Sequence, residues 1–291
     1  MNINVDNAII MAAGMSSRFA PISYEKPKAL IQVKNEVLIE RQIKQLQSAG
    51  INDITIITGY KAEQFEYLKE KFNIKTLYNQ NYNTHNNHYS LYIAKDLLKN
   101  TYICSADNYF TQNPFTATVD EAYYSSIYKN GQTDEWCITY DQNNYITDVT
   151  IGGENQWIML GHAFFSNSFS QKFKSILEKE INLKITQDKL WESIYLEHIN
   201  ELKMKINKYQ ENQIFEFDSL DELREFDHKY INDTQSKILK SISNTLKIEE
   251  KDIINIKPIK QGNQAIGIQF NANNKTFTYN YQTKLLEGEN Q

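Results

Sequence analysis

The segment Met11-Ala-Ala-Gly-Met-Ser-Ser-Arg18 restricts most strongly what this chain can fold into. It follows the apolar run at residues 8–11, which predicts a buried first strand, and Lys28 stands ten residues after Arg18. Small residues allow a sharp backbone turn. Gly14 can adopt a positive φ, and backbone N–H groups in such a turn form an anion-binding nest. Because Arg18 and Lys28 add positive charge where phosphate oxygens would lie, the segment predicts a loop that holds a nucleoside triphosphate.

The spacing of this loop separates it from two common phosphate-binding motifs. It lacks the Gly-x4-Gly-Lys-Ser/Thr pattern of a Walker A loop, and it lacks a clean Gly-x-Gly-x-x-Gly dinucleotide fingerprint. The pattern favours a nucleotidyltransferase loop. The alternative is an ordinary strand-to-helix turn with two surface cations, and the residues downstream weigh against it.

Composition excludes several classes of function. The chain has 291 residues and a net charge of −5, so it carries no basic field for nucleic acid. Its two cysteines, Cys104 and Cys137, have no metal-ligand or disulfide spacing. Because no apolar stretch approaches about 18 residues and the N-terminus shows no signal pattern, we expect a cytoplasmic protein that does not contact membranes.

Hydrophobic patterning predicts an α/β fold: a Rossmann-like, mixed but mostly parallel sheet flanked by helices. Apolar runs predict strands at 8–11, 53–58, 75–78 and 101–106, and helical spacing predicts helices at 36–49, 62–71 and 90–98. Gly50 is expected to end the helix at 36–49 as a C-terminal cap. The middle of the chain is strand-rich, at 123–128, 136–140, 146–150 and 157–165. Later helices are expected at 167–180, 187–200 and 219–230, with a short strand at 214–218 between the last two.

The composition changes near residue 233. Residues 231–291 contain eight Lys and six acidic residues, whereas the rest of the chain is acidic. A helix is expected at 236–246, and strands at 265–270 and 275–281 flank the turn Asn271-Ala-Asn-Asn274. We therefore predict two domains, residues 1–232 and a small α+β appendage at 233–291.

Several motifs resemble one family collinearly over residues 7–230. They are Ala12-Ala-Gly-Met-Ser-Ser-Arg18, Lys26-Pro-Lys-Ala-Leu30, Asn86-Asn-His-Tyr-Ser-Leu-Tyr92, Ala106-Asp-Asn-Tyr109, Glu135-Trp136 and Phe215-Glu-Phe-Asp218. Together they resemble the bacterial CTP:phosphocholine cytidylyltransferases of the sugar-phosphate nucleotidyltransferase superfamily. The chain departs from the superfamily pattern at Ser16, where Gly is usual, and this departure concerns the shape of the loop.

The resemblance implies transfer of CMP from CTP to phosphocholine, with CDP-choline and pyrophosphate as products. Asp107 follows a predicted central strand, at the edge where open α/β sheets bind ligands. A lone carboxylate at that place more often caps a helix or turn. With Asp218, the resemblance implies a Mg²⁺ site near the α-phosphate. It also implies that Arg18 braces the triphosphate and that Lys28 contacts the attacking or α-phosphate.

The resemblance extends to both substrate pockets. For the nucleotide it implies contacts from Ala12, Ala13, Gly14, Met15, Ser16, Ser17, Arg18, Asn79, Asn87, Ser90 and Ala106. For the acceptor it implies contacts from Lys28, Glu135, Trp136, Asp188, Trp191 and Glu216, because aromatic faces and carboxylates hold a quaternary ammonium group. Relatives tend to have Tyr where this chain has Leu190, which leaves room for a less methylated head group. The tryptophans are alternatively core residues.

The appendage is similar, over residues 256–281, to the opening hairpin of a choline kinase. This similarity suggests fusion to, or pairing with, a choline kinase domain, although Tyr279 and Asn280 stand where a strand cation is expected.

Two alternatives to the phosphocholine reaction stay open. One is a cytidylyltransferase for 2-aminoethylphosphonate, phosphoethanolamine or another phosphate acceptor, such as a sugar phosphate. The other is a non-catalytic nucleotide-binding module.

Overall fold

The computed structural model describes residues 2–262 and 264–289. The chain divides into two compact units: one contains the chain up to Gly14 and residues 38–216, and the other contains residues 15–37 and the chain from Phe217 onward. The boundary predicted at residue 232 lies inside the second unit, so the assignment of functions to 1–232 and 233–291 stays a prediction. No helix in the described part of the chain is long and apolar enough to cross a membrane.

The first unit is built on a seven-stranded mixed sheet. Its strands in spatial order are β12 (Lys205–Tyr209), β10 (Tyr123–Tyr140), β11 (Ile146–Phe165), β7 (Thr101–Ser105), β2 (Asn7–Ala12), β5 (Ile54–Thr58) and β6 (Lys75–Tyr78). Strands β7, β2, β5 and β6 run parallel, β12 is parallel to β10, and β11 is antiparallel to both of its neighbours. The predicted α/β fold with a mostly parallel sheet is confirmed.

Helices connect these strands. They are α2 (Leu38–Ser48), α3 (Tyr67–Phe72), α4 (Asn87–Ile93), α5 (Asn167–Glu180) and α6 (Trp191–Glu197), with the 3-10 turns η3 (Ala62–Phe65), η4 (Lys95–Leu97) and η5 (Lys184–Thr186). After α2, Gly50 has a φ of 86° and Ile51 N–H donates to Leu46 O at 3.0 Å. This closure confirms the predicted glycine C-cap.

The core of the first unit lies between sheet and helices. One cluster joins buried residues of strands, such as Ile9, Ile103 and Phe165, to residues of α5 and α6. Because α5 has its apolar residues at helical spacing, Phe169 and Phe173 reach this cluster together. The central strands are fixed by burial on both faces, and this makes their carboxyl ends a rigid edge for functional side chains.

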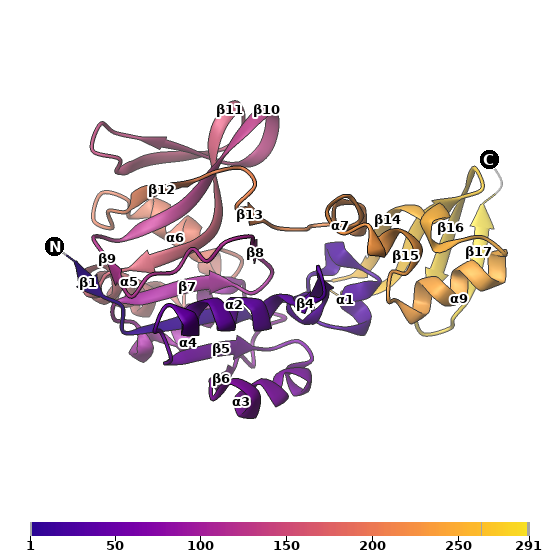
Figure 1. Ribbon diagram of the computed structural model, residues 1–291, viewed down its shortest axis with the longest axis horizontal. Helices are drawn as coiled ribbons and strands as arrows, with labels where there is room; N and C mark the ends of the chain where they lie inside the picture. Colours follow the sequence, from indigo (N-terminus) through magenta and orange to yellow (C-terminus); the bar gives the residue numbers. More distant parts are fainter. Residues whose placement is uncertain (1, 263, 290–291) are drawn as a thin grey trace. The chain divides into compact units, whose positions relative to one another are not determined.

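Some elements differ from the prediction. The two pairs of middle strands are single long strands, β10 and β11, which form an antiparallel ribbon with bulges (Figure 1). Helix α4 begins at Asn87 because the Asn86 side chain accepts a hydrogen bond from Asn87 N–H at 2.8 Å. The strand predicted at 214–218 is only two residues long, β13 (Ile214–Phe215), paired with β8 (Tyr109–Phe110). A further short pair is β1 (Ile3–Asn4) with β9 (Thr118–Val119).

The second unit contains short elements before residue 38 and a sheet near the C-terminus. Its early elements are η1 (Ser17–Phe19), α1 (Ile22–Glu25), η2 (Lys28–Leu30), β3 (Gln32–Val33) and β4 (Glu36–Val37). Its later helices are α7 (Leu220–Phe226), α8 (Lys229–Asn232), α9 (Lys237–Leu246) and η6 (Glu250–Asp252). An antiparallel sheet follows in the order β14 (Ile254–Gln261), β15 (Gln264–Ala272), β16 (Lys275–Asn280) and β17 (Leu286–Glu289).

The hairpin predicted around residues 271–274 is confirmed. Strands β15 and β16 pair from Ala272 with Lys275 to Gly267 with Asn280. Asn273 and Asn274 have φ values of 49° and 59°, the left-handed pair that a two-residue hairpin turn needs. Asparagine tolerates this conformation better than most residues.

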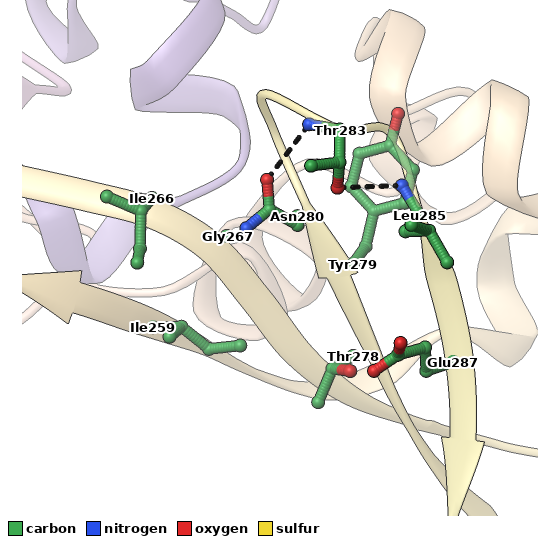
Figure 2. Close-up of a pocket in the computed structure, with 9 residues that line it drawn as sticks. All are labelled: Ile259, Ile266, Gly267, Thr278, Tyr279, Asn280, Thr283, Leu285 and Glu287. Atoms are coloured by element: carbon green, nitrogen blue, oxygen red, sulfur yellow. Dashed lines mark hydrogen bonds between the residues drawn. The ribbon is translucent and has the colours of Figure 1, made fainter.

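A small cavity of about 240 Å³ lies on this sheet (Figure 2). Apolar residues such as Ile259 and Leu285 line it, together with Tyr279, Asn280 and one acidic residue, Glu287. Among the described residues that line it, none is basic. A phosphate group would therefore meet no side-chain cation there, and the kinase-like assignment of this hairpin stays a prediction.

Candidate active site

The first loop leaves strand β2 and enters a tightly packed turn. Ala13 O accepts a hydrogen bond from Tyr60 N–H at 3.0 Å. A Cβ added to Gly59 would lie 2.8 Å from Ala13 O and 2.6 Å from Tyr82 Cβ, so only glycine fits opposite the loop. Gly14 does not have a positive φ. Within this loop, the residue in the left-handed region is Ser16, with φ 46° and ψ 47°. That conformation explains why glycine suits position 16, and Ser16 stores modest strain there.

Arg18, Lys28 and Asp218 come together within the second unit. Arg18 Nη1 lies 2.8 Å from Asp218 Oδ2, and Lys28 Nζ lies 3.9 Å from Asp218 Oδ1. The Lys28 side chain is only 4% exposed and its Nζ lies 5.8 Å from the Phe19 ring centroid, whereas the Arg18 side chain is 72% exposed. A buried cation and an accessible cation thus share one carboxylate.

Asp218 reaches this position from a helix start rather than from a strand. The chain leaves the sheet after Phe215, and Asp218 N–H donates to Glu222 Oε2 at 2.7 Å. Ser219 caps α7 by accepting from Glu222 N–H at 3.2 Å. The strand predicted at 214–218 therefore ends before Asp218, because capping of α7 replaces strand pairing at these residues.

Asp107 lies in the first unit, in the turn after β7. Ala106 N–H donates to Met11 O at 3.2 Å, which joins this turn to the first strand. Gln42 of α2 donates from Nε2 to Ser105 O at 2.9 Å and to Asn108 O at 3.5 Å. These two bonds hold the backbone on both sides of Asp107 in the sequence, at Ser105 and at Asn108. Gln42 was not predicted as a site residue; a polar residue among the buried positions of α2 is the signal that could have identified it.

Acidic side chains gather near the Asp107 turn. Asn108 Nδ2 donates to Glu216 Oε2 at 3.4 Å. Burial raises the pKa of Tyr124 well above its usual value, and three carboxylates raise it further: Glu192, Glu216 and Asp107. These groups give the first unit a negative field suited to a cation.

Glu192 is a candidate site residue that sequence reasoning missed. Burial raises the pKa of the Glu192 carboxyl to about 7. Its Oε1 accepts from Tyr124 OH at 3.3 Å and its Oε2 accepts from Asn87 Nδ2 at 3.1 Å. Asn87 Oδ1 also accepts from Trp191 N–H at 2.7 Å, so Asn87 joins the start of α4 to the start of α6. The sequence signal was an acid directly after a tryptophan at a helix start.

Two of the residues predicted to contact the nucleotide meet directly. Asn79 Nδ2 donates to Ser90 Oγ at 3.1 Å, and both side chains are buried. Asn79 N–H donates to Thr58 O at 2.7 Å at the end of β5. The pair therefore lies beside the carboxyl ends of the parallel strands, where the loop after β2 also begins.

The predicted acceptor residues occupy different environments. Trp191 is 1% exposed and stacks on Tyr124, with ring centroids 5.7 Å apart. Trp136, on β10, is half-buried and packs against the same core cluster. Glu135, Asp188 and Glu216 are exposed. The structure thus brings the two tryptophans to one cluster but gives only Trp136 an accessible ring.

The predicted metal residues fit a hard divalent cation by their chemistry. Within residues 2–262 and 264–289, no cluster of three or more His, Cys, Asp or Glu side chains is arranged to hold a metal ion. Mg²⁺ requires fewer protein ligands than that, since it is usually bound by one or two carboxylates together with substrate phosphates and water. Asp107 and Asp218 carry oxygen ligands of this kind, and their joint role in a metal site stays a prediction.

Comparisons with known proteins agree with this geometry. Residues 7–143 match the nucleotidyl transferase family model. The chain is 36% identical over 220 residues to the choline-phosphate cytidylyltransferase of Streptococcus pneumoniae, covering 76% of this chain and 96% of that protein. It is 33% identical over 234 residues to the 2-aminoethylphosphonate cytidylyltransferase of Lancefieldella rimae, covering 79% of this chain and 95% of that protein.

The fold comparison points to the same group. The solved structure of the CTP:phosphocholine cytidylyltransferase from Streptococcus pneumoniae matches with a TM-score of 0.75 at 36% identity, covering 78% of this chain and 99% of that one. The sheet, the loop after β2 and these matches define a nucleotidyltransferase. The chain belongs to the choline-phosphate cytidylyltransferase family.

Proposed function

We propose that this protein transfers CMP from CTP to phosphocholine, forming CDP-choline and pyrophosphate. The observation that carries the proposal is the 36% identity to the pneumococcal choline-phosphate cytidylyltransferase across 96% of that protein. The convergence of Arg18, Lys28 and Asp218 supports it, because phosphoryl transfer depends on positioned charge.

The reaction needs no general base. A phosphate oxygen of phosphocholine is already anionic at neutral pH and attacks the α-phosphorus of CTP, while the bond to the β-phosphate oxygen breaks and pyrophosphate leaves. Arg18, being accessible, binds the triphosphate. Lys28, being buried, neutralises the charge that grows on the α-phosphate and the attacking oxygen. Charge neutralisation and alignment then carry the catalysis.

Asp107 and Asp218 are the proposed ligands of Mg²⁺, which when bound would neutralise charge on the phosphates of both substrates. Gln42 holds the Asp107 turn through two backbone carbonyls, and Glu222 holds the Asp218 backbone. Each carboxylate is therefore supported by a polar side chain on a neighbouring helix.

The substrates are proposed to use the remaining predicted residues. Residues 12–18 contact the nucleotide phosphates and ribose, while the Asn79–Ser90 pair and Ala106 contact the base; Asn87 acts through Glu192. The choline group is held by the face of Trp136 and by the carboxylates of Glu135, Asp188 and Glu216. Trp191 supports this pocket from the core. We place the reaction in the cytoplasm, where CTP is available.

A second acceptor is favoured by a specific observation. The chain is almost as similar to the 2-aminoethylphosphonate enzyme of Lancefieldella rimae as to the choline-phosphate enzyme, and Leu190 leaves one aromatic ring fewer for a quaternary ammonium. Phosphoethanolamine is intermediate between these two acceptors, because it has the phosphate ester of phosphocholine and the primary amine of 2-aminoethylphosphonate.

Competition among acceptors tests the proposal. We expect kcat/KM for pyrophosphate release from CTP to be highest with phosphocholine when 2-aminoethylphosphonate, phosphoethanolamine and a sugar 1-phosphate are compared in Mg²⁺. A higher value for the phosphonate would transfer the proposal to that acceptor. Binding of CTP without turnover of any acceptor would favour the non-catalytic module.

A choline kinase partner is tested separately, by co-expression with a choline kinase and purification of a complex.

A further inference from the structure

Glu25 joins the cation segment, defined as residues 15–30, to the C-terminal segment, defined as residues 233–289. Its Oε1 accepts hydrogen bonds from Ile238 N–H at 2.7 Å and from Ser236 Oγ at 3.3 Å, and its Oε2 accepts from Lys237 N–H at 3.0 Å. The first N–H groups of α9 have no partner inside the helix, and the N-terminus of a helix attracts negative charge. Glu25 therefore caps a helix that lies more than 210 residues later in the sequence.

Two further contacts join the same segments. The rings of Tyr24 and Tyr281 are stacked, with centroids 4.0 Å apart and an interplanar angle of 26°. The 3-10 turn η1, which contains Arg18, packs against strand β14. The cation segment thus contacts a helix, a strand and a strand end of the C-terminal segment.

The helix that follows Asp218 is also tied to the C-terminal segment. Arg224 of α7 is 8% exposed. Its Nη1 donates to Ile253 O and its Nη2 donates to Glu250 O, each at 2.8 Å. Since α7 begins at Leu220, two residues after Asp218, this anchor lies close along the chain to the carboxylate that Arg18 and Lys28 share.

These contacts reach the two cations through short, packed connections. Glu25 is the last residue of α1, and Lys26 N–H closes that helix by donating to Ile22 O at 2.9 Å. Lys28 begins η2 two residues later, and its buried Nζ lies over the ring of Phe19, next to Arg18. A shift of α1 therefore moves both cations, and displacements of about 1 Å at a reacting centre cost up to about 100-fold in rate.

We infer that the C-terminal segment positions Arg18 and Lys28 for catalysis, with Glu25 as the positioning residue. The consequence for turnover rests on the proposed function of these two cations. Through these contacts, the proposed active site of this chain depends on the C-terminal segment.

The full chain with Glu25→Ala tests the inference. We expect kcat/KM for CTP to fall about tenfold, with a rise in KM for CTP and a fall in kcat. Hydrogen exchange should become faster in residues 15–30 and at the start of α9, and stay unchanged in β2, β5 and β7. Glu25→Gln keeps one acceptor oxygen and should restore part of both effects.

Glu249→Ala is the matched control, because its carboxylate caps η6 inside the C-terminal segment without touching the cation segment. Tyr281→Leu removes the stacking on Tyr24 from the other side, and it serves if Glu25→Ala does not fold. Equal kinetics in Glu25→Ala and Glu249→Ala, with unchanged exchange in residues 15–30, would overturn the inference. Hydrogen exchange can be measured without turnover. A wild-type protein inactive on every acceptor would therefore refute the proposed function, and hydrogen exchange alone would then decide whether Glu25 positions residues 15–30.

Discussion

Arg18 Nη1 lies 2.8 Å from Asp218 Oδ2, and this ion pair connects the first loop to the segment before α7. Lys28 Nζ lies 3.9 Å from Asp218 Oδ1, the other oxygen of the same carboxylate. One acid thus faces an accessible cation and a buried one. Such a cluster keeps the two cations at a fixed spacing, which is what binding of neighbouring phosphate groups needs.

Asp218→Asn should lower kcat by about 100-fold or more and raise the Mg²⁺ concentration for half-maximal rate, because it removes a proposed metal ligand. The fold should survive, since the side chain is 34% exposed. Pyrophosphate release measured against Mg²⁺ concentration checks this. Asp221→Asn, which removes only the 3.1 Å pair with Arg224, is the control. Equal Mg²⁺ dependence in both variants would exclude Asp218 from the metal site.

Gln42→Met should lower kcat by about tenfold and raise the Mg²⁺ requirement, because the Asp107 turn loses the donor that holds Ser105 O and Asn108 O. Gln47→Met is matched to it: Gln47 lies on the same helix and donates to Phe72 O at 2.8 Å, away from that turn. The control should lose stability only. Similar kinetic losses in the two variants would show that Gln42 acts through stability alone.

Trp136→Ala and Trp191→Ala should separate binding from packing. Trp136 is half-buried, so its loss should raise KM for phosphocholine far more than KM for CTP. Trp191 is 1% exposed, so its loss should cost about 3–5 kcal/mol of unfolding free energy. Steady-state kinetics and urea unfolding of both variants check the pair of outcomes. A Trp136 variant with equal changes in the two KM values would argue against a choline contact.

Stability should fall in mild acid because of His162. Burial lowers the pKa of His162 to about 3, and its neutral ring lies 2.8 Å from Tyr123 OH and 3.0 Å from Ser125 Oγ. Because the folded pKa is depressed, the stability from the neutral ring is present above the unfolded pKa of about 6.5 and decreases as the pH falls toward 3. The loss is about 2 kcal/mol at pH 5.

Urea unfolding of wild type and His162→Gln at pH 7.5 and pH 5 measures this contribution. The variant should show a pH dependence smaller by about 2 kcal/mol, since glutamine does not titrate. Identical pH dependence in the two proteins would mean that His162 can be charged in the folded state.

Much of the fold followed from local patterns in the sequence. Apolar runs such as 53–58 located the buried parallel strands, and Gly50 located the end of α2. Asn271–Asn274 located the hairpin of the C-terminal sheet. These signals work because burial and turn geometry act within a few residues.

Long-range contacts were not accessible in the same way. The Glu25 cap on α9 joins residues more than 210 apart, and an acid after a short helix gives no local sign of it. Glu192 and Gln42 likewise act through partners on other elements. The contacts of Asp218 with Arg18 and Lys28 were not predicted, because they depend on how separate segments pack.

The central claim is transfer of CMP to phosphocholine, and ³¹P NMR of the reaction tests it most directly. With CTP, phosphocholine and Mg²⁺, we expect the coupled diphosphate signals of CDP-choline and the signal of pyrophosphate to grow in equal amounts while CTP and phosphocholine decline. An unchanged phosphocholine signal, with CTP intact or hydrolysed, would contradict the account.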